Sequence, residues 1–298
     1  MTLTAFWLIL LSAVLHASWN FISKTHRPSV VFYAQSSGTA ALFWLPMLLY
    51  VRPDFTQLPL NFWLFMLGSV FFNVTYYTGL AHAYAKSDIS MAYPMARSLP
   101  VLLTAVITVL FGFGTPPGAL AWCGLVLISC GCLLLPLPGL KAFNWKTYRT
   151  PVLGFIILAA LGTTGYTIVD SFGIKLAIES LENVNNLHGC IYMSLVEPLN
   201  CLGLLLVTAG SKNNRLEFKK SFARSIWPSL SGVACSLAYV LILAAMPFVS
   251  NVSFVQAFRQ MSLPLCIIAG IVILHERCTL TKVIGCLAIV SGLVLTSI

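Results

Sequence analysis

Charged side chains are scarce in this chain. Only 8% of its 298 residues are Asp, Glu, Lys or Arg, while 58% are hydrophobic and the mean hydropathy is +0.90. A soluble domain carries about 25% charged residues. The deficit therefore excludes an ordinary soluble domain and predicts an integral membrane protein with little mass outside the bilayer.

The sequence also lacks the common motifs of enzyme and metal chemistry. It has no P-loop, no His-Glu-x-x-His motif and no Gly-x-Ser-x-Gly motif. Its nine cysteines are scattered, and even the closest two, Cys130 and Cys132, lack zinc or redox spacing. We therefore expect no cofactor, no metal and no enzymatic activity. The net charge of +9 comes mostly from short loops, so nucleic acid is not an expected partner.

Ten apolar runs are each about long enough, at roughly 20 residues, to cross a bilayer as a helix. Barrel strands would be about 10 residues long and alternate in polarity. The predicted fold class is therefore an all-α integral membrane protein with ten transmembrane helices. The first residues carry no positive leader, so we expect the first helix to be retained. The runs lie near 3–23, 30–51, 61–84, 90–112, 117–137, 151–173, 186–209, 226–246, 250–274 and 279–298.

Lys and Arg are distributed unevenly between the two sets of loops. Loops after even-numbered runs, with both termini, hold only Arg52 and Lys175. Positive residues favour the cytoplasm, so we expect both termini outside it, in a bacterial cytoplasmic (inner) membrane. The basic connections 136–151 and 210–225 are interpreted as orientation signals. Loops after odd-numbered runs hold thirteen basic residues: Lys24, Arg27, Lys86, Lys141, Lys146, Arg149, Lys212, Arg215, Lys219, Lys220, Arg224, Arg277 and Lys282.

The two halves of the sequence resemble each other. Segment 92–112, AYPMARSLPVLLTAVITVLFG, matches segment 254–274, FVQAFRQMSLPLCIIAGIVIL, and aligns Arg97 with Arg259. Each half holds five runs, an odd number, so the halves have opposite topology. Inverted repeats of this kind are typical of secondary transporters, with a site where the halves meet.

Two further matches support the repeat. GLVLISCGCLLL at 124–135 matches GCLAIVSGLVLT at 285–296, which aligns Gly131 with Gly292. SAVLHASWNFIS at 12–23 matches GTTGYTIVDSFG at 162–173. That match places His16 on Tyr166 and Asn20 on Asp170, so we expect two polar helix faces to meet at the repeat axis.

The segments HASWNFISK (16–24), YPMARSLPVLLTAVI (93–107) and FRQMSLPLCIIAGIVILHER (258–277) resemble the EamA family of the drug/metabolite transporter superfamily. The resemblance covers nearly the whole chain, as one EamA-like repeat at 1–138 and another at 139–298. It implies ten helices, a central cavity and transport of small metabolites or amphipathic compounds, often as export. The Gly-Glu-Arg-like ending of the fourth helix occurs only once, as HER at 275–277, so no role of that acid extends to the first half.

Ionisable residues within the runs are candidate site residues, because a charge at the bilayer centre costs about 2.5–3.5 kcal/mol. Arg97 and Arg259 predict an anion clamp, or alternatively a structural ion pair or an arginine that reaches the surface. Asp170 is interpreted as a cavity wall that handles a proton or amine, or as a solvated residue near a helix end. Glu197, beside Pro198, predicts a coupling site or a permanent ion pair.

The predicted cargo site draws on both halves of the sequence. Lys24 is interpreted as a surface residue, and Glu276 with Arg277 as a terminal ion pair. The candidate proton-coupling residues are Asp170 and Glu197. The candidate cargo-binding residues are His16, Trp19, Asn20, Tyr76, Tyr93, Arg97, Tyr166, Asp170, Tyr239, Gln256, Arg259 and Gln260.

The function that these features favour is secondary-active transport by alternating access. The expected activity is export of a small polar or amphipathic metabolite, such as an amino acid, an organic anion or a zwitterion, coupled to protons or to exchange. A lipid or amphipathic-drug flippase or efflux protein of the same fold is the alternative, and an intramembrane enzyme or a scaffold has little support. The expected partners are the cargo, the bilayer and protons, for a monomer or a homodimer.

Overall fold

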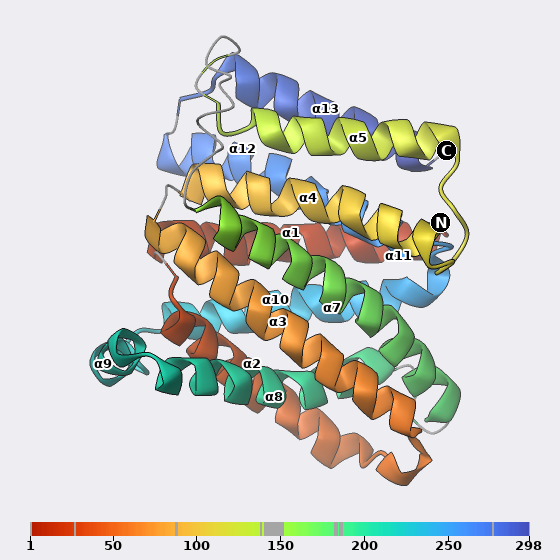
Figure 1. The fold of residues 1–298 in the computed structure, drawn as a ribbon, viewed down its shortest axis with the longest axis vertical. Coiled ribbons are helices and arrows are strands. Elements are labelled where there is room, and N and C mark those ends of the chain that lie inside the picture. Colours follow the sequence, from red (N-terminus) through yellow and green to blue (C-terminus); the bar gives the residue numbers. More distant parts are fainter. Residues whose placement is uncertain are drawn as a thin grey trace.

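The computed structural model describes residues 2–26, 28–86, 89–137, 139, 152–181, 184, 187–275 and 277–297, without the side chains of residues 24, 89–93 and 274. These residues form a bundle of helices and no strand (Figure 1). The longer helices are α1 (Leu3–His26), α2 (Val30–Val51), α3 (Leu60–Lys86), α4 (Ile89–Leu110), α5 (Ala119–Leu134), α7 (Leu153–Ser180), α8 (His188–Gly210), α10 (Trp227–Ala245), α12 (Ser262–Leu274) and α13 (Leu280–Ser297). The shorter ones are η1 (Phe55–Gln57), α9 (Lys212–Ser221), η3 (Met246–Phe248), α11 (Val252–Phe258) and η4 (Arg259–Met261).

Seven of these helical segments are long and apolar enough to cross a membrane, namely α1, α3, α7, α8, α10 with η3, α11 to α12, and α13. Large apolar side chains stay exposed on their outer faces, such as Leu11, Leu67, Leu206 and Val272. Apolar surface on this scale is unfavourable in water and stable against lipid. The prediction of an all-α, multi-pass membrane protein is confirmed at this level.

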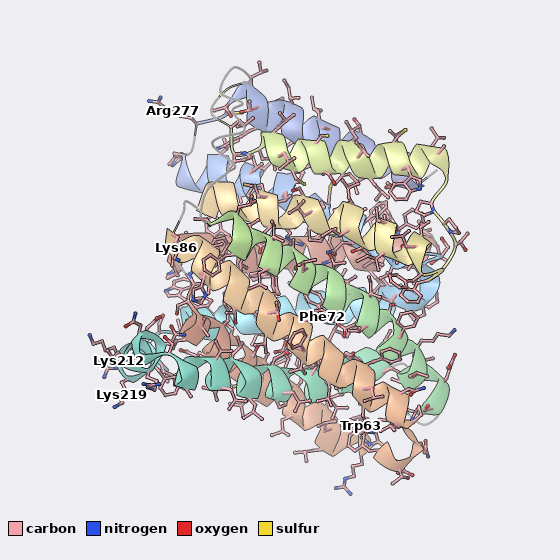
Figure 2. All side chains as sticks on the ribbon, viewed as in Figure 1. Trp63, Phe72, Lys86, Lys212, Lys219 and Arg277 are labelled. Carbon is pink, nitrogen blue, oxygen red and sulfur yellow. The ribbon has the colours of Figure 1, made fainter. Side chains whose placement is uncertain are left out.

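The predicted connection 210–225 contains a helix that its basic, polar sequence did not indicate. Helix α9 begins after Ser211, whose side chain accepts a hydrogen bond from the Asn214 amide, and Glu217 accepts one from the Ser29 hydroxyl at the start of α2. It lies at one end of the bundle (Figure 1). The labelled cations Lys86, Lys212, Lys219 and Arg277 lie at that same end (Figure 2). The predictions for the side chain of Lys24, for Glu276 and for most of 136–151 lie outside what the structure describes.

Helices α3 and α7 pack closely because glycine is present where they cross. A Cβ atom at Gly162 would lie 2.6 Å from the backbone nitrogen of Tyr76, and one at Gly79 would lie 2.8 Å from the carbonyl oxygen of Phe155. Only glycine permits this approach of backbones. As a result the rings of Tyr76 and Tyr166 meet edge to face, with centroids 5.8 Å apart.

The helical run from α11 to α12 is interrupted in its middle. The 3-10 turn η4 separates the two helices and contains Arg259. Pro264 explains the break, because it has no amide proton and its ring clashes with the carbonyl four residues earlier, at Gln260. Breaks inside membrane helices are tolerated where they line a cavity. This break places Arg259 at the inner face of the bundle.

At the end opposite α9, one asparagine ties two connections together. The Thr108 hydroxyl donates to Asn251 Oδ1 at 3.2 Å, and Asn251 Nδ2 donates to the Thr115 carbonyl at 3.1 Å. The Thr115 amide in turn donates to the Ser250 carbonyl at 3.1 Å. Asn251 also caps α11. We refer to the contacts of Asn251 and Ser250 with Thr108 and Thr115 as the Asn251 clasp.

Candidate functional site

A small polar cavity lies among α1, α3, α7, α8, α10 and η4. Its volume is about 20 Å³, enough for about one water molecule. The protein is therefore closed around this site, and a larger molecule enters only if the helices move apart. The lining residues are His16, Trp19, Asn73, Tyr76, Tyr77, Tyr166, Met193, Val196, Glu197, Asn200, Cys235, Tyr239 and Arg259.

Arg259 is buried and faces polar groups from two other helices. Its Nη2 donates to Tyr166 Oη at 3.0 Å and contacts His16 Nε2 at 3.1 Å, while its Nη1 donates to Gln256 Oε1 at 3.1 Å. Because guanidinium nitrogen only donates, His16 Nε2 must accept, which assigns the ring proton to Nδ1. The guanidinium thus keeps its positive charge while three neutral side chains hold it in place.

The positive charge of Arg259 has no direct counter-charge in the described part of the chain. The side-chain ion pair found there within 4.0 Å joins Lys175 to Glu179 on the exposed end of α7. Arg259 Nε also lacks a hydrogen-bond partner. A buried, uncompensated cation with a free donor is costly. The arrangement is suited to binding an anionic group that enters the cavity.

Asp170 is buried beside the cavity and accepts two tyrosine hydrogen bonds. Tyr192 Oη donates to its Oδ1 at 2.7 Å, and the Tyr239 hydroxyl donates to its Oδ2. Tyr239 itself lines the cavity, so its hydroxyl connects Asp170 with the side chains around Arg259. The two phenols stabilise a carboxylate inside the bundle without a direct cation.

Glu197 is the acid that lines the cavity itself. It is 5% exposed, and its Oε2 has no hydrogen-bond partner. Ser37 on α2 and Asn200 on α8 are its polar neighbours. The cavity therefore carries one acidic and one basic side chain, which do not form an ion pair with each other.

The structure brings many of the predicted site residues together. His16, Trp19, Tyr76, Tyr166, Tyr239 and Arg259 line this one cavity, with Gln256 behind Arg259. The remaining buried candidates, Asn20, Arg97, Asp170 and Gln260, are not in its lining. Gln260 instead donates to the Gln256 carbonyl at 3.0 Å, and both polar side-chain atoms of Asn20 lack a partner. The side chain of Tyr93 lies outside the described residues.

Several residues of the site were missed from the sequence. Tyr192 holds Asp170, while Asn200, Met193, Val196 and Cys235 add to the lining. The spacing of Met193, Val196, Glu197 and Asn200 by three and four residues around a buried acid was a usable signal of an inward helix face. Nothing in the sequence identified Tyr192 as the partner of Asp170. Among the described residues, no group of three or more His, Cys, Asp or Glu is placed to hold a metal ion.

Comparison with known proteins identifies the fold alone. No family model matches the chain, and no curated protein matches it. It does superpose on a crystal structure of another protein with a TM-score of 0.68, covering 99% of this chain and 96% of the other. The two sequences are 13% identical. The likeness therefore extends over the whole helical bundle and carries no information about cargo.

Proposed function

We propose that the protein is a secondary-active transporter, an exporter of a small polar or amphipathic metabolite such as an amino acid, an organic anion or a zwitterion. The observation that supports this most is Arg259, a buried guanidinium with no carboxylate within 4.0 Å among the described residues, in the wall of an aromatic cavity. A permanent structural arginine would be expected to have a carboxylate partner. A site that binds and releases an anionic group leaves that position open.

The proposal includes ten membrane spans and inverted repeats, as in the EamA family that the sequence resembles. Helices α2, α4 and α5 lie within the bundle among the seven long apolar segments, and with them the spans would number ten (Figure 1). His16 and Tyr166, which the repeat alignment treats as equivalent, contact the same Arg259 nitrogen. A two-fold related pair of helices would place equivalent residues on a shared site in this way.

The packing of α5 against α13 also supports the two-fold relationship. A Cβ atom at Gly124 would lie 2.5 Å from the Gly292 carbonyl oxygen, and one at Gly131 would lie 2.8 Å from that of Gly285. The sequence repeat aligns Gly124 with Gly285 and Gly131 with Gly292. Gly124 thus contacts the repeat equivalent of Gly131, and Gly131 contacts the repeat equivalent of Gly124. This is the pattern of a self-complementary two-fold contact.

The proposed orientation is that of a bacterial inner-membrane protein with both termini outside the cytoplasm. The two termini lie at the same end of the bundle, opposite the labelled cations (Figures 1 and 2). In this orientation the basic helix α9 lies at the cytoplasmic face. A fluorescent protein fused after Ile298 in a bacterial host is expected to stay dark, because it folds poorly outside the cytoplasm. Bright cells would contradict the orientation.

Alternating access would open the cavity to one side at a time. The Asn251 clasp ties the outer connections, and the cavity holds about one water, so the structure corresponds to a closed step of such a cycle. Asp170 and Glu197 are the proposed proton-coupling residues, because each is a buried acid without a cation within 4.0 Å among the described residues.

The direct test is flux through purified protein in liposomes. An imposed pH gradient is expected to drive concentrative movement of a small carboxylate-bearing metabolite, and liposomes without protein serve as the control. If no member of a panel of amino acids and organic acids moves, the proposal is wrong. Movement of fluorescent lipid between leaflets instead would favour a flippase of the same fold.

A further inference from the structure

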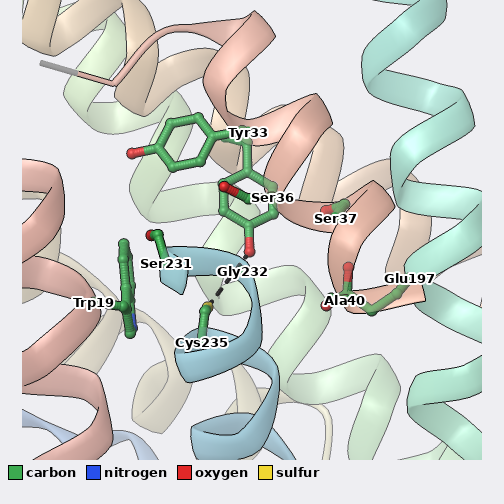
Figure 3. A pocket seen from close by; sticks show the side chains of 10 residues that line it. Trp19, Tyr33, Ser36, Ser37, Ala40, Glu197, Ser231, Gly232 and Cys235 are labelled. Atoms are coloured by element: carbon green, nitrogen blue, oxygen red, sulfur yellow. Dashed lines mark hydrogen bonds between the residues drawn. The ribbon is translucent and has the colours of Figure 1, made fainter. Parts of the chain in front are cut away.

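A second small cavity adjoins the central one at Glu197. It has a volume of about 10 Å³ and shares Trp19, Tyr77, Glu197 and Cys235 with the central cavity. Glu197 extends from α8 toward α2, and Trp19 lies across the pocket from it (Figure 3). Glu197 therefore stands where the two cavities meet.

The carboxylate of Glu197 lacks a positive partner. It is buried, its Oε2 makes no hydrogen bond, and its polar neighbours Ser37 and Asn200 are neutral. No Lys, Arg or His of the described residues lies within 4.0 Å of it. An acid held this way is stabilised when a cation or a proton arrives.

The surroundings of Glu197 are suited to an organic cation. Trp19, Tyr33 and Tyr77 line the adjoining cavity, and the rings of Tyr33 and Tyr77 are 4.7 Å apart. Aromatic faces attract ammonium groups, most strongly when water is excluded. An acid beside such rings is the chemistry that recognises an amine.

We infer that the cargo is a zwitterion, which places its carboxylate on Arg259 and its ammonium on Glu197. The inference rests on the transport function proposed above and narrows its cargo. Both side chains line the same cavity, from η4 and α8, and neither has an ion-pair partner among the described residues. A zwitterion compensates both charges at once. A plain organic anion would leave Glu197 unpaired, and a plain amine would leave Arg259 unpaired.

Three probes that differ only in their end groups test this assignment. Phenylalanine carries both charges, phenethylamine only the ammonium, and 3-phenylpropionate only the carboxylate. Their dissociation constants are measured calorimetrically on the full chain in lipid nanodiscs, where phenylalanine is expected to bind the wild type most tightly. Glu197→Gln is expected to weaken the binding of phenylalanine and phenethylamine by at least about tenfold and to leave the binding of 3-phenylpropionate unchanged. Arg259→Gln is expected to weaken phenylalanine and 3-phenylpropionate instead.

Two further variants keep the result interpretable. Glu179→Gln removes an exposed acid and is expected to change none of the three constants. Trp19→Leu removes an aromatic face and is expected to weaken the two amines selectively, which gives a second route if Glu197→Gln does not fold. Retained binding of 3-phenylpropionate shows that Glu197→Gln and Trp19→Leu are folded, and retained binding of phenethylamine shows the same for Arg259→Gln.

The inference is overturned if 3-phenylpropionate binds the wild type as tightly as phenylalanine, or if Glu197→Gln leaves amine binding unchanged. Flux separates this failure from failure of the transport proposal. If the liposomes transport 3-phenylpropionate but not phenylalanine, the transport proposal stands and the zwitterion inference is wrong. If phenylalanine binds through both charges but no probe is transported, the zwitterion site stands and the transport proposal is wrong.

Discussion

The guanidinium carbon of Arg259 lies 5.5 Å from the ring centre of Tyr239. The hydroxyl of the same tyrosine donates to Asp170, so an aromatic ring stands between the two opposite charges. Direct contact would neutralise both in a fixed ion pair. The intervening ring instead stabilises the cation through its face and the carboxylate through its hydroxyl. Neither charge is therefore neutralised in a fixed ion pair with the other.

Arg259 is expected to be the most sensitive single position for cargo that carries a carboxylate. Arg259→Gln removes the charge, and uptake of such cargo into liposomes is expected to fall at least about tenfold. Arg259→Lys keeps the charge but loses the planar fork that holds Tyr166 and Gln256, so an intermediate loss is expected. Arg277→Gln, on an exposed connection, is the matched control. If Arg259→Gln takes up cargo at the wild-type rate, Arg259 is not part of the cargo site.

Asp170 is expected to be needed for coupling more than for binding. Asn at position 170 cannot exchange a proton, so Asp170→Asn is expected to lose accumulation driven by an imposed pH gradient while cargo-for-cargo exchange continues. Tyr239→Phe removes one hydrogen bond to the same carboxylate and is expected to shift the pH dependence of uptake. Glu179→Gln serves as the exposed acidic control. Accumulation by Asp170→Asn at the wild-type level would exclude Asp170 as the coupling residue.

The sequence was sufficient to predict the helical membrane fold and part of the site. The scarcity of charged residues indicated that lipid surrounds the protein, and the length of the apolar runs located the helices, because both depend on local composition. Alignment of the halves singled out His16, Tyr166 and Arg259, which meet at one guanidinium in the structure. Such residues are visible in the sequence because polarity inside a bilayer is costly and therefore rare.

The rest of the site could not be predicted because it depends on how helices cross. The hydrogen bond from Tyr192 to Asp170 joins α8 to α7, and its geometry follows from packing of whole helices. Helix α9 was interpreted as a basic connection because its short length and high charge resemble a loop.

The close approach of α5 and α13 is expected to depend on glycine. At Gly292 a Cβ atom would lie 2.7 Å from the Gly124 carbonyl oxygen, whereas at Gly154 nothing lies within 4 Å. Gly292→Leu is therefore expected to destabilise the protein by about 1–3 kcal/mol or more, and Gly154→Leu to change stability far less. Thermal unfolding in detergent, followed by fluorescence, compares the two variants. Equal melting temperatures would contradict this packing.

The Asn251 clasp is expected to control opening of the end of the bundle opposite α9. Asn251→Ala removes the hydrogen bonds to Thr108 and Thr115, at a cost of about 1–3 kcal/mol for the buried groups left unpaired. Hydrogen exchange measured by mass spectrometry is therefore expected to become faster at 111–118 and 246–251, and to stay unchanged in α9. Asn214→Ala, on α9, is the matched control. Unchanged exchange in both connections would show that this end of the bundle is held by apolar packing and that the clasp contributes little to its closure.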